Sequence, residues 1–311
     1  MRPQVSALLP IRNGERWIKS SISNLNQVLN SDDELLIIDD GSNDDTVAII
    51  RESTIIPHLK LISTSGRGLV NALNTGIAEA KNQWIARFDV DDEYEPERID
   101  LQLTDIPSGV VAVFTDFKTY SEKGEFLGYF PSPLSDIAIL ISLARSERNA
   151  HPSVIFRKDS VLEVGAYREE DFPCEDLSLW LRLAQIGKLH GISRPALKYT
   201  LRADSVSSTR YSEAKEKTER IFNTFFDLRD RNQLQSISDT LQLYKKSTYG
   251  LERKIYLLRD AFVSHVWRRL ETKVKLLLII VTIQIFLNPQ TYLLFLRELR
   301  FRSIRRKIRG N

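Results

Sequence analysis

Short apolar runs alternate with helical patterns over the first hundred residues, and this alternation constrains the fold more than any other feature. The expected strands are residues 5–9, 34–38, 59–62 and 84–88, and the expected helices are residues 17–29, 45–50 and 68–80. Strands that alternate with helices pair in parallel and carry helices on both faces of the sheet. We therefore predict an α/β fold with a mostly parallel sheet, which binds ligands beyond the carboxyl ends of its strands.

The pattern becomes mixed after residue 100. Further strands are expected at residues 110–115, 153–156 and 196–201, with a hairpin at residues 119–129 and a helix at residues 177–184. From about residue 208 the sequence is mostly helical and rich in Lys, Arg and Glu. We predict a domain boundary near residue 205, with an α/β domain at 1–205 and a mainly helical region at 206–311.

The composition excludes several classes of protein. With 42% hydrophobic and 27% charged residues, the chain is an ordinary globular sequence rather than a disordered or fibrous one. Its single cysteine, Cys174, cannot form an internal disulfide, and its four histidines are too scattered for a zinc site. The first residues contain no apolar run long enough for a signal peptide, so we expect a reducing, cytoplasmic location.

The charge is concentrated at one end. Residues 297–311 contain seven Lys and Arg against one Glu, a charge of +6, whereas the whole chain carries +3. Residues 276–287, just before this tail, are the most apolar stretch, and a helix of that length spans about 18 Å, against about 30 Å for a bilayer core. We predict a segment lying on the inner membrane surface, or alternatively a buried or dimerisation helix. No nucleic-acid partner is expected.

Three carboxylates follow the strand expected at residues 84–88. Asp89 and Asp91 point the same way on extended chain, while Asp92 is expected to turn outward. Clustered carboxylates repel one another unless a cation neutralises them, and hard oxygen ligands suit Mn²⁺ or Mg²⁺. The alternative is a solvated acidic turn that caps the helix expected to start near Pro96.

Two further acidic motifs occupy similar positions. Asp40, in Asp39-Asp40-Gly41-Ser42, ends the second strand, where it could accept a hydrogen bond from a base or ribose; an ordinary turn is the alternative. Glu175 and Asp176 begin the helix expected at residues 177–184. A helix N-terminus keeps a carboxylate ionised, as a general base requires, although a simple helix cap is the alternative.

These motifs lie in a sequence that resembles glycosyltransferase family 2, a large inverting family with the GT-A fold. The matching runs are, in order, VSALLPIRNGERWIKSSISNLNQ, DELLIIDDGSNDDT, GRGLVNALNTGIAEAKNQWIARFDVDDEYEPERI and HPSVIFRKDSVLEVGAYREEDFPCEDLSLWLRLAQIGKLH. The resemblance covers about two-thirds of the chain and fades after Ser205. Three motifs in the correct order and spacing make it specific.

The resemblance implies a nucleotide-sugar-binding catalytic domain at residues 1–205 and assigns five residues to the donor. Pro10, Arg12 and Asn13 would lie on the loop that holds the nucleotide, Asp40 would read the base, and Arg67 would contact the donor. Arg12 stands where an aromatic residue that stacks on the base is commoner in the family. An arginine at this position leaves the base without that stacking partner.

The resemblance also assigns residues to the metal, the catalytic base and the acceptor. Asp91 would be the direct ligand of Mn²⁺ or Mg²⁺, and Asp89 would lie nearer the ribose. Asp176 would be the catalytic base, with Glu175 beside it in contact with substrate. His151 would lie beside the acceptor cleft, although a structural histidine is an equal alternative.

The activity implied is metal-dependent, inverting transfer of a single sugar, as in a hexosyltransferase. The donor would be a nucleotide-diphosphate sugar, most simply a UDP-sugar, and the acceptor a glycan or lipid-linked hydroxyl in cell-surface polysaccharide synthesis. The Gln-x-x-Arg-Trp motif of processive polysaccharide synthases is absent from the sequence, which favours single-sugar transfer. The enzyme would work peripherally on the cytoplasmic face of the membrane.

Two alternatives belong to other classes. A sugar nucleotidyltransferase also uses acidic residues and Mg²⁺, but it usually carries a glycine-rich basic loop where residues 10–16 contain one glycine. A non-catalytic peripheral membrane scaffold would have no need for three acidic motifs. Released nucleoside diphosphate would indicate glycosyl transfer, and released pyrophosphate the first alternative.

Overall fold

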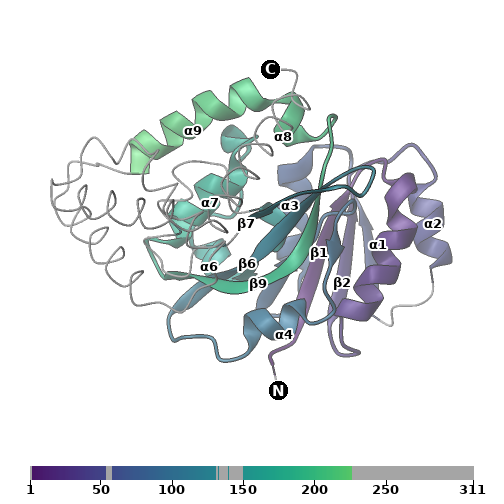
Figure 1. The fold of residues 1–311 in the computed structure, drawn as a ribbon, viewed down its shortest axis with the longest axis horizontal. Coiled ribbons are helices and arrows are strands. Elements are labelled where there is room, and N and C mark those ends of the chain that lie inside the picture. Colours follow the sequence, from purple (N-terminus) through teal and green to yellow (C-terminus); the bar gives the residue numbers. More distant parts are fainter. Residues whose placement is uncertain (1, 54–57, 131, 133–138, 140–149, 226–311) are drawn as a thin grey trace, which may run out of the picture.

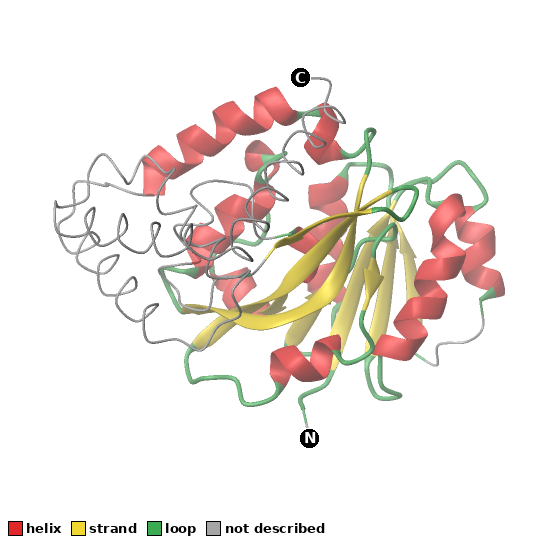
Figure 2. Ribbon diagram, in the orientation of Figure 1, coloured by secondary structure: helices red, strands yellow, loops and turns green. Residues whose placement is uncertain are grey.

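The computed structural model describes residues 2–53, 58–130, 132, 139 and 150–225. In these residues a single nine-stranded sheet lies between helices, as Figures 1 and 2 show. The described part ends in two helices that follow the last strand and lie over one side of the sheet (Figure 1). The chain is therefore an α/β protein, as predicted.

The sheet has a parallel half and a mixed half. Its strands are β1 (Val5–Ile11), β2 (Glu34–Asp39), β3 (Leu59–Ser63), β4 (Trp84–Arg87), β5 (Glu93–Tyr94), β6 (Val110–Ser121), β7 (Phe126–Phe130), β8 (Ile155–Arg157) and β9 (Lys188–Leu201). They run in the order β3-β2-β1-β4-β8-β6-β9-β5, with β7 paired to β6. Strands β1 to β4 pair in parallel, and β8 runs antiparallel to both β4 and β6. The mixed half begins where the sequence pattern becomes mixed.

The helices in the described part cover both faces of the sheet. They are α1 (Glu15–Val28), α2 (Thr46–Glu52), α3 (Leu69–Glu79), α4 (Arg98–Leu103), α6 (Lys158–Glu163), α7 (Glu175–Leu183), α8 (Val206–Thr209) and α9 (Tyr211–Phe225), with short 3₁₀ turns η1 (His151–Ser153) and η2 (Glu169–Asp171). Alternate residues of β1 face opposite layers, so Leu9 packs with Ile18 of α1 and Leu8 with Leu73 of α3. This double coverage explains why every residue of β1 is buried.

Strand β1 is longer than the sequence suggests. It continues through Pro10 to Ile11, although a proline cannot donate to a strand ladder. The carbonyl of Leu8 accepts from Phe88 on the β4 side, and that of Ile11 accepts from Asp40 on the β2 side. Pro10 therefore faces the β4 side, where β4 has already ended, and no ladder hydrogen bond is lost.

Some elements differ from the sequence-based expectation. The expected strand at 110–115 continues to Ser121 as β6, because its polar second half pairs with β9 along its length and with β7. The expected hairpin turn at Gly124 is present. Strand β5 and helix α6 were not predicted from the sequence. Both are short, and β5 forms only by pairing with distant β9.

A buried ion pair fixes the N-terminus. Asp33, on the loop before β2, accepts two hydrogen bonds from Arg2, at 3.0 and 2.6 Å, and one each from the backbone N–H groups of Val5 and Asn30. Both side chains are almost fully buried. We expect Asp33→Ala to lower the free energy of unfolding by about 3–5 kcal/mol, because two backbone N–H groups lose their acceptor and the buried Arg2 guanidinium keeps only its pair with exposed Asp100. Urea unfolding measures this, and exposed Asp32→Ala, the matched control, should change it little; equal losses in the two variants would contradict the assignment.

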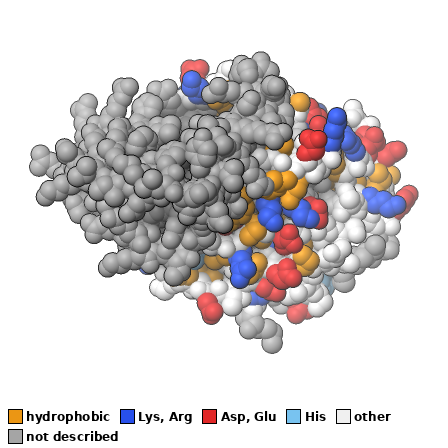
Figure 3. Space-filling model, in the orientation of Figure 1, with side chains coloured by type: hydrophobic (Ala, Val, Ile, Leu, Met, Phe, Trp, Pro, Cys, Tyr) orange, Lys and Arg blue, Asp and Glu red, His pale blue; other side chains and the backbone are white. Residues whose placement is uncertain are grey.

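The sequence changes character where the structure places α8 and α9. Both helices follow residue 205, and the rest of the predicted helical region, the apolar stretch at 276–287 and the basic tail lie outside the described residues. Among the described helices, none is long and apolar enough to cross a membrane. On the described part of the face in Figure 3, acidic and basic side chains are interspersed.

Candidate active site

A cleft of about 420 Å³ opens at the carboxyl edge of the parallel strands. The predicted site residues that line it are Pro10, Asp89, Asp91, His151, Glu175 and Asp176. They come from β1, the loop after β4, η1 and the start of α7, which are distant in sequence. The metal motif and the proposed base therefore share one cavity, in the position where open α/β sheets bind ligands.

Three carboxylates form a compact cluster at one end of the cleft. Ligand oxygens from Asp89, Asp91 and Asp92 all lie within 4.8 Å of one another. Burial and the neighbouring Asp89 raise the pKa of Asp91, and burial with the charges of Asp91 and Asp89 raises that of Asp92 well above its usual range. This set of hard oxygen donors fits a divalent cation such as Mn²⁺ or Mg²⁺.

The inward position of Asp92 corrects the expectation that it turns outward. Its side chain is buried, and one carboxylate oxygen accepts a 2.8 Å hydrogen bond from the backbone N–H of Thr200. The pairing of Glu93 and Tyr94 with β9 draws this segment inward. Its other oxygen, Oδ2, is buried without a hydrogen-bond partner among the described residues, which leaves it available to a cation.

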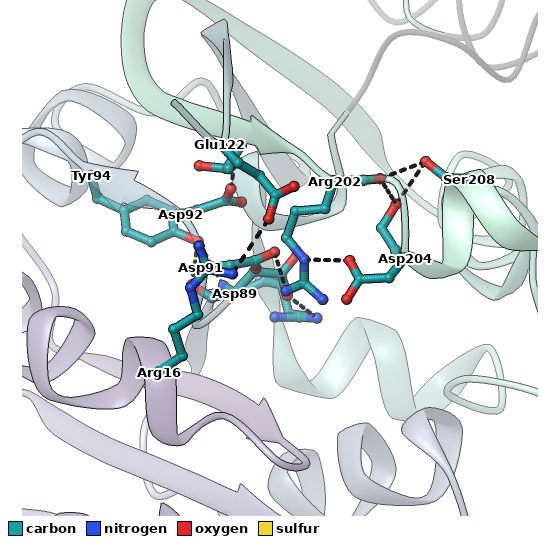
Figure 4. Close-up of polar contacts among 12 residues, drawn as sticks. Arg16, Asp89, Asp91, Asp92, Tyr94, Glu122, Arg202, Asp204 and Ser208 are labelled. Carbon is teal, nitrogen blue, oxygen red and sulfur yellow. Dashed lines mark hydrogen bonds and ion pairs between the residues drawn. The ribbon is translucent and has the colours of Figure 1, made fainter. Parts of the chain in front are cut away.

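Two arginines that belong to none of the predicted motifs pair with the cluster. The Arg87 guanidinium lies 2.5 Å from Asp89, and the Arg202 guanidinium lies 2.8 Å from Asp91. Arg87 is the last residue of β4 and is buried, whereas Arg202 directly follows β9 (Figure 4 shows Arg202 reaching Asp91). Both line the cleft.

The second acidic pair also lines the cleft. Glu175 and Asp176 form the first turn of α7, where Asp176 Oδ1 accepts the backbone N–H of Leu177 at 2.7 Å. Burial and the charge of Asp176 raise the pKa of Glu175 to about 8. Burial raises the pKa of Asp176 to about 6, although helix N–H groups and Arg87 act in the opposite direction. At neutral pH, Asp176 is therefore the ionised member of the pair.

His151 lies between this pair and a buried tyrosine. Its Nε2 is 2.7 Å from the Tyr167 hydroxyl, and its Nδ1 is 4.0 Å from Glu175. Burial and the nearby Arg87 lower the pKa of His151 well below its usual value, so the ring is neutral and the Glu175 contact is not an ion pair. A structural hydrogen bond thus holds a ring that lines the cleft, and the role of His151 beside an acceptor stays a prediction.

The other predicted donor residues do not line the cleft. Asp40 is buried, and its carboxylate accepts from the Thr64 hydroxyl at 2.7 Å and from the Gly68 N–H at 2.8 Å. It therefore fixes the loop that carries Arg67, whose side chain is exposed. The adjacent Gly41 has a φ of +74°, and a Cβ there would lie 3.2 Å from the Gly66 backbone, so this close approach requires glycine.

The loop after β1 is ordered by contacts with the loop after β2. The N–H of Asn13 donates to the Ser42 hydroxyl at 2.8 Å, and the Asn13 side chain accepts from the Asn43 N–H at 2.9 Å. Arg12 beside it is exposed. Both loops lie at the same edge of the sheet as the cleft, since they follow neighbouring parallel strands.

Comparison with known protein sequences gives one family match and relatives that cover different shares of the chain. Residues 6–163, just over half of the chain, match the family model described as glycosyl transferase family 2. The amylovoran biosynthesis glycosyltransferase AmsE of Erwinia amylovora is 28% identical over 189 residues, which is 58% of this chain and 70% of AmsE. An uncharacterized glycosyltransferase of Rickettsia bellii is 23% identical over 68% of this chain, but the match spans only 31% of that longer protein.

Solved structures share the fold at low identity. S. aureus TarS residues 1–349, in complex with UDP-GlcNAc, superposes with a TM-score of 0.59 and 16% identity, over 99% of this chain and 92% of that one. The mannosyltransferase PcManGT of Pyrobaculum calidifontis, in complex with GDP-Man and Mn²⁺, gives a TM-score of 0.55 and 16% identity, over 97% and 85% of the two chains. At these identities the similarity concerns the fold.

Proposed function

Because the chain belongs to glycosyl transferase family 2 and has the GT-A fold, we propose that it is a metal-dependent, inverting enzyme that transfers a single sugar. The donor would be a nucleotide-diphosphate sugar, most simply a UDP-sugar. The acceptor would be a hydroxyl of a glycan or lipid-linked glycan in cell-surface polysaccharide synthesis. The similarity to an amylovoran biosynthesis enzyme supports this class of product.

One observation carries the proposal: Asp91 and Asp176 line the same cleft in different charge environments. Asp91 belongs to a cluster of oxygen ligands, while Asp176 stands apart from it at a helix N-terminus. A donor held at the cluster would present its anomeric carbon to an acceptor hydroxyl beside Asp176. The two functions that glycosyl transfer requires, donor binding and proton removal, would thus have separate carboxylates.

The cluster would hold the cation, and the rest of the cleft would perform the transfer. Bound by Asp91 with Asp89 and Asp92, Mn²⁺ or Mg²⁺ would supply positive charge to the leaving diphosphate. Asp176 would accept the proton of the acceptor hydroxyl as that oxygen bonds to the anomeric carbon. The bond from this carbon to the diphosphate oxygen breaks on the opposite face, so the diphosphate leaves with the electron pair and the configuration inverts.

The surrounding groups would set the charge of the base. The raised pKa of Glu175 keeps that neighbour protonated at neutral pH, so a second negative charge does not oppose ionisation of Asp176. The pKa of His151 is lowered well below its usual value, so its neutral ring can hydrogen-bond a sugar hydroxyl. Glu175 would contact substrate through Oε2, which has no hydrogen-bond partner in the described part of the chain.

The nucleotide would bind beside the cleft, on the loops after β1, β2 and β3. Pro10 lines the cleft itself, and exposed Arg12, Asn13 and Arg67 lie on these loops. Asp40 would read the base only if ligand binding releases its present partners, Thr64 and Gly68; otherwise it would position the loop that carries Arg67. Titration of UDP against GDP would show which base the site accepts.

The membrane part of the proposal concerns residues beyond the described helices. The apolar stretch at 276–287 and the basic tail at 297–311 would lie on the inner membrane surface and bring the cleft near a lipid-linked acceptor. The proposed arrangement is a catalytic domain at residues 1–205 with a mainly helical, membrane-associating region at 206–311. Sedimentation with anionic vesicles, before and after truncation at residue 270, tests it.

A panel of nucleotide sugars tests the enzymatic proposal. The full-length protein with Mn²⁺ should hydrolyse or transfer at least one of them and release the nucleoside diphosphate, detected by ion-exchange chromatography. Release of pyrophosphate from a sugar phosphate and a nucleoside triphosphate would instead identify a nucleotidyltransferase. Absence of metal-dependent binding by any nucleotide sugar would favour a non-catalytic scaffold.

The pH dependence of kcat follows from the pKa of Asp176. Because the base must be ionised, kcat should fall about tenfold for each pH unit below about 6 and level off above it. Initial rates from pH 4.5 to 8 at saturating donor measure this limb, and an unchanged Kd for UDP over the same range would exclude loss of donor binding. A flat profile between pH 5 and 8 would contradict the assignment of the base.

A further inference from the structure

We propose that Arg202 is an internal competitor of the divalent cation: it occupies the Asp91 carboxylate when the cation is absent and must leave for the cation to bind. The inference rests on the proposed function, because it assumes that Asp91 is a metal ligand. It adds a residue from outside the acidic motif, between β9 and the C-terminal helices. Metal binding would then involve a local rearrangement of the protein.

The contacts of Arg202 hold its guanidinium over the acidic cluster. Its Nη1 lies 2.8 Å from Asp91 Oδ2, and its Nε donates to Asp204 at 2.9 Å. The guanidinium also lies 4.2 Å from the centre of the Trp17 ring, at the start of α1. Figure 4 shows the side chain extending between Asp91 on one side and Asp204 on the other. Stacking on the aromatic ring and pairing with a carboxylate on each side both stabilise the guanidinium in this position.

Two of the three carboxylates of the cluster are already paired with guanidiniums without a cation. Arg87 pairs with Asp89, and Arg202 pairs with Asp91. A divalent ion would therefore approach carboxylates whose charge is already partly offset, although the three carboxylates alone would attract it strongly.

Arg202 is the exchangeable partner and Arg87 the fixed one. Arg87 is 2% exposed within β4, so its departure would expose a buried strand. The Arg202 side chain is 15% exposed and follows the last residue of β9. After leaving Asp91 it keeps Asp204 and Trp17 as partners, so the cost of its displacement is small compared with that of unpairing a buried arginine.

The same residue connects the cluster to the C-terminal helices. The backbone carbonyl of Arg202 accepts hydrogen bonds from the hydroxyls of Ser205 and Ser208, at 3.0 and 2.7 Å. Ser205 precedes α8, and Ser208 lies within it. The position of Arg202 is thereby tied to the start of α8, so displacement of its side chain occurs where the C-terminal region joins the sheet.

The expected size of the effect follows from population arithmetic. If Arg202 occupies Asp91 in about 90% of molecules, the apparent affinity for a cation is reduced about tenfold, because only the remaining fraction can bind it. Removing the guanidinium should restore that factor. Arg202→Met, which keeps much of the side-chain length, should therefore bind Mn²⁺ about tenfold more tightly than the unsubstituted protein.

The test is a titration of the full-length protein with Mn²⁺ alone, followed by the electron paramagnetic resonance signal of the free ion. Arg202→Met should lower the Kd about tenfold, and Trp17→Leu, which removes only the stacking partner, should lower it by a smaller factor. Arg16→Met is the matched control, because Arg16 lies near Trp17 and pairs with Glu122 at 3.7 Å. It should leave the Kd unchanged, and an equal gain there would show a general charge effect and overturn the proposal.

A fourth variant separates failure of this inference from failure of the proposed function. Asp91→Asn should abolish binding of Mn²⁺ in the presence or absence of Arg202. If it does, but Arg202→Met binds Mn²⁺ no more tightly than the unsubstituted protein, the competition is wrong and the metal site stands. If Asp91→Asn has no effect on the binding of Mn²⁺, or if no protein binds the ion, both proposals fall.

Discussion

Replacing Asp176 by asparagine is expected to lower kcat by about 10²–10⁴-fold, the range that general-base catalysis contributes. Asparagine has nearly the same shape, and its Oδ1 can still accept the N–H of Leu177, so the start of α7 should be preserved. What it loses is the ability to take a proton. The measurement is the initial rate of sugar transfer at saturating donor, with the Kd for UDP and Mn²⁺ measured in parallel.

Glu175→Gln is the matched control for Asp176→Asn. Glu175 precedes Asp176 on α7 and lines the same cleft, but its raised pKa of about 8 leaves it protonated at neutral pH. An amide therefore resembles its working form, and we expect a much smaller loss of kcat than for Asp176→Asn. If Glu175→Gln were the inactive variant and Asp176→Asn retained the unsubstituted rate, the two roles would have to be exchanged.

Replacing Asp91 by asparagine should remove metal-dependent donor binding. Changes to groups that only support a metal ligand already cost 10–100-fold in metal affinity, so loss of the ligand itself should weaken binding of Mn²⁺ and UDP by about 100-fold or more. The effect should appear in binding as well as in rate, unlike that of Asp176→Asn. Calorimetric titration of UDP in the presence and absence of Mn²⁺ measures it.

Asp204→Asn is the matched control for Asp91→Asn. Both carboxylates pair with the same guanidinium of Arg202, but Asp204 is largely exposed and lies outside the acidic cluster. Its substitution should leave metal-dependent binding of UDP intact. Equal losses in the two variants would show that the arginine, rather than a cation on Asp91, carries the interaction with the nucleotide.

The position of Asp40 and Asp89 at the same edge of the sheet could be predicted from the sequence because it follows from topology. The apolar strands before Asp40 and Asp89 can be recognised in the sequence, and parallel pairing brings their carboxyl ends to one edge of the sheet. Glu175 and Asp176 could be placed at a helix start from the helical pattern after them. Whether this helix start faces the metal motif could not be predicted in this way. Helix α7 packs against β6 and β9, and β8 lies between β6 and β4 in the sheet.

The charges around the site were harder to predict, because they depend on distant pairings. Asp92 is drawn inward by the contact of β5 with β9, residues that lie more than a hundred positions apart. Arg202 reaches Asp91 from the end of β9. Arg87 offered one local signal: an arginine within an otherwise apolar strand, next to an acidic motif, requires a buried counter-charge.

Asp40 shows a limit of assigning roles from motifs. Its position at the end of β2 was predicted, but its carboxylate is engaged by Thr64 and Gly68 on the next loop. A motif specifies where a side chain leaves the backbone, whereas its partners depend on a loop whose conformation the sequence pattern does not reveal. The same holds for exposed Arg12 and Arg67, whose contacts depend on the nucleotide itself.

The central claim is that Asp91 and Asp176 serve one cleft in separate roles, and calorimetry with UDP tests it most directly. UDP is titrated into the full-length protein, Asp91→Asn and Asp176→Asn, each with and without Mn²⁺. We expect the unsubstituted protein and Asp176→Asn to bind UDP with the same Mn²⁺-dependent Kd. Asp91→Asn should show no Mn²⁺-dependent heat. Equal Mn²⁺-dependent binding in all three proteins, or loss of binding in Asp176→Asn alone, would contradict it.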